Sequence, residues 1–178
     1  DPLVQQNHMR PVFPSLAALA WREPRRRAYW ETELINALKI VQRGWSTPAE
    51  MRGSWAGAMG HTQWMPEVWL NVGFDYDGDG RVSPFGRPDD ALGSTARYLV
   101  KRGKYHRNEH WGYEVRAPGG AASGSRSYAA WASAGVTRAD GRPFPHPNAS
   151  AKLWTPVRGG PSFLLGPNFY SVRSYNPS

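Results

Sequence analysis

The sequence predicts an α+β fold that is predominantly α-helical, with a small β-containing lobe toward the C-terminal end. Apolar residues recur at helical spacing, and proline with acidic residues marks helix starts. Two short apolar runs late in the chain flank a Gly/Pro turn, which is typical of a β-hairpin. We therefore expect a single domain over residues 1–178, incomplete at both ends, with the β-containing lobe at residues 117–166.

Two helices are predicted near the start of the chain. Residues 15–21 (SLAALAW) favour a short helix, and Pro24 suits the first position of the next one. The second helix is amphipathic, because apolar side chains recur at helical spacing at Leu34, Leu38 and Val41. Its charged face carries Glu31 and Glu33, which we expect to be solvated.

Further helix starts are indicated in the middle of the chain. Residues 47–50 (TPAE) have the pattern of a capping box, and Pro66 opens a brief helix through Leu70. Residues 88–90 (PDD) place proline and two carboxylates at a helix start, where the carboxylates complement the helix dipole. The buried stripe predicted for that helix consists of Leu92, Ala96, Leu99 and Val100.

The predicted lobe lies in the last third of the chain. Residues 117–125 (APGGAASGS) are predicted to be an exposed loop, and Ser127 to cap a short helix. Residues 151–157 and 162–165 are predicted as two strands of a hairpin. The aromatic tail, residues 167–176, is predicted to be extended.

Composition narrows the function classes. No apolar run approaches the ~20 residues that span a bilayer, and the absence of cysteine excludes disulfides and thiol chemistry. The net charge of +8 favours a polyanionic partner, either nucleic acid or an anionic cell wall or lipopolysaccharide. The basic residues are scattered apart from Arg25–Arg27, which disfavours nucleic acid. Nine tryptophans suit stacking on sugars or bases, although most buried aromatic residues simply form the core.

A loop at residues 75–81 (DYDGDGR) alternates carboxylates as the first half of an EF-hand calcium loop does. Its predicted ligands are the carboxylates of Asp75, Asp77 and Asp79 and the backbone carbonyl of Arg81. Position 12 is Gly86, which offers no carboxylate, so Asp90 or its neighbour Asp89 is the predicted replacement. Carboxylates this close repel one another unless a cation offsets their charge, which favours structural Ca²⁺ over a solvated Asp/Gly turn.

Residues 53–66 (GSWAGAMGHTQWMP) combine small residues, one amide and two aromatic residues, as a cradle for a polar polymer would. They resemble the G-S-x-A-G-A-M-G-x-x-Q-F-M-P signature of the membrane-bound lytic murein transglycosylase B family. The acidic loop stands where that family carries its EF-hand-like calcium loop. Residues 15–34, 89–103 and 167–176 also resemble family segments, in the family's order.

The resemblance implies a lysozyme-like fold and a periplasmic lytic transglycosylase. In that family one glutamic acid protonates the leaving oxygen of the MurNAc–GlcNAc β-1,4 bond of peptidoglycan. The same group then acts as a base while the muramic 6-hydroxyl attacks C1, which gives a 1,6-anhydromuramic acid product. The implied partners are peptidoglycan glycan strands and no nucleic acid. We expect a monomer, lipid-anchored to the outer membrane through an N-terminus ahead of Asp1.

The resemblance also implies site residues. Ser54 and Gln63 match polar groups beside the acid, and Met59 and Trp64 match an apolar wall, with Trp64 replacing the usual phenylalanine. The other implied substrate-binding residues are Tyr98, Tyr170, Tyr175 and Asn176. The alternative for the glycines of this stretch is that they merely permit close helix packing.

The catalytic glutamate is not identified among these residues. The family's E-x-x-[FWY]-G motif falls in the register of Asp1 or ahead of it, and residues 1–14 do not match that motif. Our interpretation is that the acid lies upstream. A missing segment between Gln6 and Phe13 is a second explanation, and a third is a protein that binds peptidoglycan as a scaffold without cleaving it. A fourth alternative, a protein that binds nucleic acid, is supported only by the net positive charge.

Overall fold

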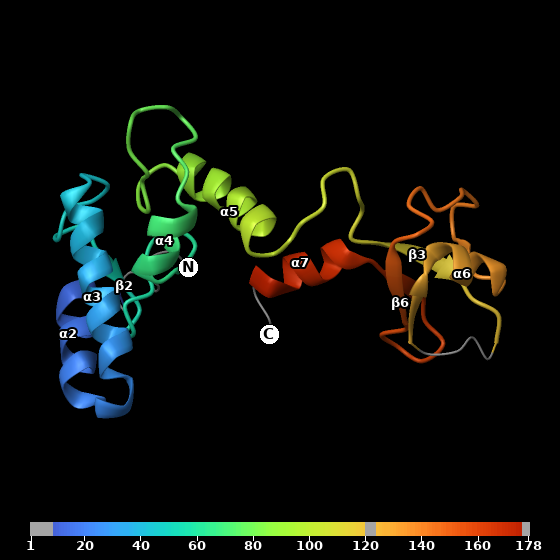
Figure 1. Cartoon of the computed structure of the whole chain (residues 1–178), viewed down its shortest axis with the longest axis horizontal. Coiled ribbons are helices and arrows are strands. Elements are labelled where there is room, and N and C mark those ends of the chain that lie inside the picture. The colour runs from blue at the N-terminus through green and yellow to red at the C-terminus, as the bar shows by residue number, and fades with distance from the viewer. Residues whose placement is uncertain (1–8, 120–123, 176–178) are drawn as a thin grey trace. The chain divides into compact units, whose positions relative to one another are not determined.

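The computed structural model describes residues 9–119 and 124–175. The chain divides into two compact units, the helical unit (Asp1–Tyr98) and the sheet unit (Leu99–Ser178), which we describe separately. Figure 1 shows helices through the blue and green part of the chain, and strands in its yellow-to-red part. Helices and a sheet are both present, in agreement with the predicted α+β class. No helix in the described ranges combines the length and the apolar character that crossing a membrane requires.

The helical unit holds most of the helices. In chain order it contains β1 (Arg10–Pro11), α2 (Val12–Arg22), the 3-10 helix η1 (Pro24–Arg26), α3 (Arg27–Gln42), β2 (Arg52–Gly53) and α4 (Pro66–Val72). Helix α5 (Asp89–Lys101) begins in this unit and ends in the sheet unit. Helices α2 and α3 pack side by side, and α4 packs against α3 (Figure 1). Strands β1 and β2 pair antiparallel, so the chain ahead of α2 lies beside the start of residues 53–66.

The buried faces of α3 and α5 differ from the predicted apolar stripes. The buried residues are Trp30, Glu33, Asn36, Ala37 and Ile40 in α3, and Asp90, Ala91 and Ser94 in α5. Leu38, Leu92 and Val100 are instead exposed, so the predicted stripes are wrong. Polar contacts set the rotation of α5, because buried Ser94 Oγ accepts a hydrogen bond from Phe74 N at 2.9 Å.

The capping box predicted at residues 47–50 is confirmed. Thr47 N donates to Glu50 Oε2 at 3.0 Å, and Glu50 N donates to Thr47 Oγ1 at 3.4 Å. These bonds hold the pKa of Glu50 below its ordinary value, because they stabilise the charged carboxylate. The segment forms one turn rather than a helix, and it leads directly into β2.

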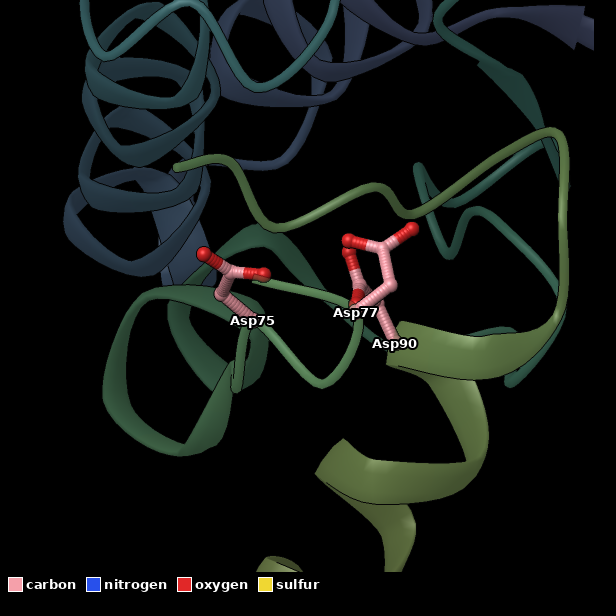
Figure 2. A group of neighbouring side chains, drawn as sticks. All are labelled: Asp75, Asp77 and Asp90. Carbon is pink, nitrogen blue, oxygen red and sulfur yellow. The ribbon is translucent and has the colours of Figure 1, made fainter. Parts of the chain in front are cut away.

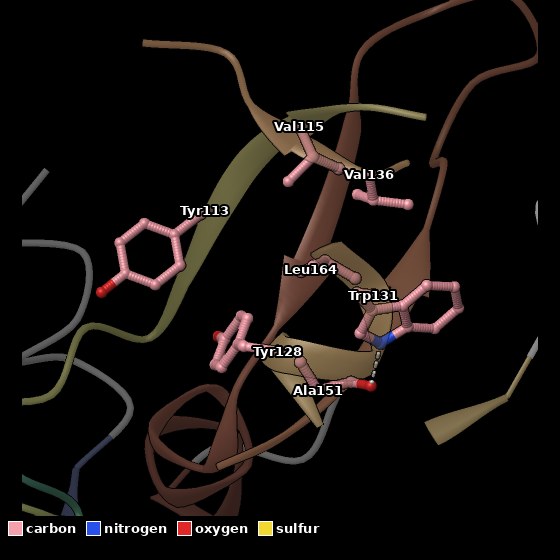
Figure 3. Packing of buried hydrophobic residues seen from close by; sticks show 7 residues of the cluster. All are labelled: Tyr113, Val115, Tyr128, Trp131, Val136, Ala151 and Leu164. Atoms are coloured by element: carbon pink, nitrogen blue, oxygen red, sulfur yellow. Dashed lines mark hydrogen bonds between the residues drawn. The ribbon is translucent and has the colours of Figure 1, made fainter. Parts of the chain in front are cut away.

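The sheet unit is built on a five-stranded antiparallel sheet. Its elements are β3 (Gly112–Arg116), β4 (Ser125–Ser127), α6 (Tyr128–Ser133), β5 (Thr137–Arg138), β6 (Ser150–Trp154), β7 (Ser162–Leu165) and α7 (Pro167–Tyr175), and the strand order is β4-β6-β7-β3-β5. Figure 3 shows its core, formed by Tyr113, Val115, Tyr128, Trp131, Val136, Ala151 and Leu164. Buried Trp131 Nε1 donates to Ala151 O at 2.9 Å, which ties α6 to β6.

Two local predictions in this unit are confirmed. Strands β6 and β7 form the hairpin, with Leu153 opposite Leu164, although β6 ends at Trp154 rather than at residue 157. Ser127 caps α6, since its Oγ accepts a hydrogen bond from Ala130 N at 3.1 Å. Residues 120–123 of the predicted loop lie outside the described residues.

The prediction of an extended tail is wrong, because residues 167–175 form helix α7. Asn168 in its first turn is fully buried and hydrogen-bonds the loop ahead of β3. Its Oδ1 accepts from His106 N at 2.7 Å, and its Nδ2 donates to the carbonyl oxygens of His106 and Glu109, each at 2.8 Å. These long-range bonds hold the start of the helix in place, and local sequence patterns do not reveal them.

Glu33 is a buried carboxylate in the middle of α3, so the expectation that it is solvated is wrong. It is 3% exposed, and its Oε2 accepts a hydrogen bond from Glu67 N, in the first turn of α4, at 3.0 Å. Burial raises the pKa of Glu33 above its ordinary value because desolvation disfavours the charged form, an effect that the Glu67 N–H partly opposes. Glu33 thereby joins α3 to the helix that directly follows residues 53–66.

The raised pKa of Glu33 predicts a pH dependence of stability. An acid whose pKa is higher in the folded state contributes stability below its unfolded pKa, and this contribution is lost as pH rises through the folded pKa. We expect the free energy of unfolding of Glu33→Gln, minus that of the wild type, to increase from acidic to neutral pH in urea denaturation. Exposed Glu31→Gln on the same helix is the matched control. Parallel curves for Glu33→Gln and the wild type would contradict the assignment.

Candidate functional site

Residues 53–66, the signature loop, fold back on themselves between β2 and α4. Met59 N donates to Trp64 O at 2.9 Å, and Trp64 N donates to Met59 O at 3.2 Å. Ser54 N donates to Ala58 O at 2.8 Å, and Ser54 Oγ accepts from Ala58 N at 3.2 Å. The loop therefore satisfies much of its own backbone, which favours one defined conformation.

Two glycines of the signature loop stand where the backbone closely approaches other groups. Gly60 has φ 74°, and a Cβ at this position would lie 2.4 Å from Pro84 O. Gly57 has φ 84°, and a Cβ there would lie 2.6 Å from Leu16 Cδ2. Both positions need glycine for backbone conformation and for space. Close packing alone therefore accounts for these two glycines.

Five predicted substrate-binding residues lie in the helical unit: Ser54, Met59, Gln63, Trp64 and Tyr98. Trp64 is largely buried and stacks on Tyr98 of α5, with ring centroids 5.3 Å apart. Met59 is fully buried. Gln63 is exposed at φ 52°, and its Nε2 donates to Gly60 O at 2.9 Å. The structure thus brings the signature loop and α5 together and leaves the Gln63 amide at the surface.

Asp75, Asp77 and Asp90 form a group of converging carboxylates, shown in Figure 2. One oxygen of each lies within 4.8 Å of the others. Asp90, in the first turn of α5, is buried, and its two oxygens accept hydrogen bonds from Tyr76 N and Ser83 N, both at 2.8 Å. These bonds fix the acidic loop on α5. Each carboxylate oxygen keeps a further lone pair with which it can bind a cation.

The other two predicted ligands, Asp79 and Arg81, are placed differently. Asp79 is exposed and is not part of the group of converging carboxylates found among the described residues. Its Oδ1 instead accepts a hydrogen bond from Arg81 N at 2.8 Å. The three carboxylates that do converge carry like charges, which a divalent cation would offset, and their hard oxygen atoms suit such an ion.

His61 connects the signature loop to the segment after the acidic loop, and sequence reasoning missed it. Its backbone N donates to Pro84 O at 3.1 Å, and its Nε2 lies 2.7 Å from Gly86 O. Together with the close approach of Gly60 to Pro84, these contacts hold the two loops against each other. The partners of His61 are backbone carbonyls, which every residue carries, so no signal in one sequence could have found this role.

The remaining predicted substrate residues belong to the sheet unit. Tyr170 and Tyr175 both lie on α7 and line a groove of about 670 Å³. Tyr170 is 43% exposed and meets Phe169 edge-on, with ring centroids 5.4 Å apart. Asn176 lies outside the described residues.

Comparison with known proteins places these features in a family. Residues 5–178 match the family described as Transglycosylase SLT domain. The chain belongs to this family. The chain is also 32% identical over 174 residues to membrane-bound lytic murein transglycosylase B of Escherichia coli K12. This match covers 94% of the present chain and 46% of the relative. The resemblance predicted from residues 53–66 and the segments around them is confirmed.

Solved structures of lytic transglycosylases share the SLT-domain fold of this chain. SltB3 from Pseudomonas aeruginosa, in complex with NAG-NAM-pentapeptide, is 39% identical with a TM-score of 0.78, over 95% of this chain and 47% of that one. Slt35 from Escherichia coli, in complex with calcium, is 30% identical with a TM-score of 0.72, and the match covers 94% of this chain and 54% of the Slt35 chain. The SLT domain described here therefore spans about half the length of the relatives it matches.

Close packing of the signature loop predicts that Gly60→Ala destabilises the protein more than Gly44→Ala. Both glycines have positive φ, for which a side chain costs about 1–2 kcal/mol. Gly44 has open space around it, whereas a Cβ at Gly60 meets Pro84 O, which adds roughly 1–3 kcal/mol. Urea denaturation followed by tryptophan fluorescence measures both variants. Equal losses of unfolding free energy in the two variants would contradict this prediction, because they would show that the loop can move to accommodate a Cβ beside Pro84 O.

Proposed function

We propose that this chain cleaves peptidoglycan as a lytic transglycosylase, breaking the MurNAc–GlcNAc β-1,4 bond and releasing 1,6-anhydromuramic acid products. The signature loop carries the proposal, because a sequence of that pattern is folded tightly against the acidic loop and α5. Membership of the SLT domain family supports it. Two relatives add support: one is named as a lytic murein transglycosylase, and SltB3 was solved with NAG-NAM-pentapeptide.

The proposed reaction needs one carboxyl group with two successive roles. It first protonates the glycosidic oxygen and then takes the proton of the muramic 6-hydroxyl as that oxygen attacks C1. We propose that this group is a glutamate ahead of Asp1, as the family resemblance implies, with a pKa raised by an apolar pocket. Buried Glu33 is not proposed for this role, because its Oε2 is engaged by Glu67 N at 3.0 Å.

The proposed substrate contacts follow from the exposure of each predicted residue. Gln63 offers an exposed carboxamide to sugar hydroxyl or acetamido groups. The Ser54 oxygen already accepts from backbone N–H groups, so it contributes its hydroxyl hydrogen. Met59 and Trp64 are buried and so support the loop rather than contact the sugar, and Trp64 stacks on the ring of Tyr98. In the sheet unit the proposed contacts are Tyr170, Tyr175 and Asn176.

We propose that Asp75, Asp77 and Asp90 hold a structural Ca²⁺, with Asp79 and the Arg81 carbonyl as further ligands. The convergence of three carboxylates supports this assignment, and Escherichia coli Slt35 was solved in complex with calcium. When bound, the ion supplies positive charge that offsets carboxylate repulsion. The residues of this chain then hold the acidic loop, and through Pro84 the signature loop, in one conformation.

A periplasmic location and attachment to the outer membrane through a lipid anchor are part of the same proposal, as is a monomeric state. Peptidoglycan, the proposed substrate, lies in the periplasm. The name of the Escherichia coli relative, which is membrane-bound, supports the attachment.

The products test the proposed reaction. Incubation with purified murein sacculi should release muropeptides that are lighter by one water than the hydrolysis products, as mass spectrometry would detect.

Gln63→Ala should lower the rate of product release about tenfold or more if its amide contacts the reacting sugar, because a lost polar contact of this kind is worth about 1–2 kcal/mol. Gln42→Ala, at the exposed end of α3, is the matched control. Reducing-end products would point to a hydrolase, and no products to a peptidoglycan-binding scaffold.

Calcium should raise the melting temperature of the wild type, and a chelator should reverse the effect. At a hundredfold excess over Kd the expected stabilisation is about 2.7 kcal/mol. Asp77→Asn should lose most of this shift, because Asp77 is an exposed member of the converging group and its removal leaves the core intact. Asp140→Asn in the sheet unit should keep it. A wild-type melting temperature that does not respond to calcium would remove the ion from the proposal.

A further inference from the structure

A groove of about 670 Å³ runs along α7 in the sheet unit. It is lined mainly by Lys152 and Trp154 of β6, and by Phe169, Tyr170, Arg173 and Tyr175 of α7. Tyr170 and Tyr175 already have a proposed role. Lys152, Trp154 and Arg173 have none, although they form the other part of the same lining. A volume of this size suits a ligand larger than a single ion or water molecule.

Trp154 belongs to a closed set of four aromatic residues beside this groove. Its ring centroid lies 6.4 Å from that of Phe163 and 6.5 Å from that of Phe169. Trp111 completes the set, at 6.1 Å from Phe163 and 6.3 Å from Phe169. Both tryptophans are 46% exposed, so each leaves part of its indole surface in contact with water, which is unfavourable for an apolar ring. Such supported rings suit the C–H faces of pyranose sugars.

The charge of the chain is concentrated in the same unit. The sheet unit contains eleven Lys and Arg against three Asp and Glu, whereas the helical unit contains eleven of each. The entire net charge of +8 therefore belongs to the sheet unit. Among the described residues, neither Lys152 nor Arg173 has an ion-pair partner, whereas Arg138 is paired with Asp140. The cations that line the groove are thus available to an anionic ligand.

We propose that this groove is a binding site for an acidic glycopeptide polymer, in which Trp154 stacks on a pyranose ring while Lys152 and Arg173 bind carboxylates of the peptide stems. This inference rests on the proposed function, since peptidoglycan combines sugar rings with acidic peptides. Single-stranded nucleic acid fits less well, because it carries one phosphate for each base and needs cations along its whole track. The lining groups offer two cations to several rings.

Co-sedimentation of the full chain with sacculi tests the aromatic part. Trp154→Ala should weaken binding about tenfold, the equivalent of ~1.4 kcal/mol of stacking. Trp154→Tyr, which keeps an aromatic ring, should stay within about twofold of the wild type. Trp21→Ala is the matched control, because Trp21 is 82% exposed and lies on α2 in the helical unit. Its binding should equal that of the wild type.

Sacculi from which the peptides have been removed by an amidase test the charged part. Lys152→Gln should weaken binding to intact sacculi about threefold, the size expected of an exposed ion pair, and should have no effect on peptide-free glycan. Trp154→Ala should weaken binding to both. Arg158→Gln, in the exposed turn between β6 and β7, is the charge control. An equal effect of Lys152→Gln on both polymers would overturn the carboxylate assignment.

The outcomes separate this inference from the proposed reaction. If the wild type releases anhydromuropeptides but Trp154→Ala binds sacculi as tightly as the wild type, the proposed reaction stands and the proposed binding site in the groove is wrong. Trp154-dependent binding without any products removes the activity and keeps the groove. A lowered melting temperature of Trp154→Ala with unchanged binding would show that these rings are covered by protein, which also overturns the inference. Tighter binding to DNA than to sacculi at physiological salt would do the same.

Discussion

The helical unit depends on the buried carboxylate of Asp90. Its two oxygens accept hydrogen bonds from Tyr76 N, near the start of the acidic loop, and from Ser83 N, two residues after its end, so one residue of α5 holds the chain on both sides of the loop. A buried carboxylate is stable only where its charge is met by hydrogen bonds or a cation, and Asp75 and Asp77 converge on it from the loop. The position of Pro84, directly after Ser83, follows from this anchoring, and Pro84 O then receives the backbone N–H of His61.

The signature loop is thereby defined from several sides. His61 and Gly60 hold it against Pro84, its own backbone bonds close it between Met59 and Trp64, and Trp64 stacks on Tyr98. Glu33 extends the arrangement by binding the first turn of α4, which directly follows the loop. A site for a polymer gains from such support, because side chains that are already fixed lose little conformational freedom on binding. In this respect the proposed calcium site and the proposed substrate site are parts of one arrangement.

The two units divide the physical properties of the chain between them. The helical unit has balanced charge, buried carboxylates and a loop that is shaped by backbone contacts. The sheet unit carries the whole excess of positive charge and an aromatic groove on α7. Long-range attraction of an anionic polymer would therefore act mainly on the sheet unit, whereas the signature residues lie in the helical unit. Substitutions in the two units can therefore test the proposed polymer binding and the proposed reaction separately.

Local patterns in the sequence determined the helix starts at Pro66 and Asp89, the capping box at residues 47–50, the β6–β7 hairpin and the family, because proline, capping side chains and a contiguous signature act over short distances. Tertiary structure alone decided which helix faces are buried. Leu92 is exposed and Asp90 buried on α5, since hydrogen bonds from Tyr76 N and Ser83 N to the Asp90 carboxylate outweigh the apolar stripe. The same reason explains the burial of Glu33 and the helix at residues 167–175, whose Asn168 binds a loop some sixty residues away in sequence, at His106 and Glu109.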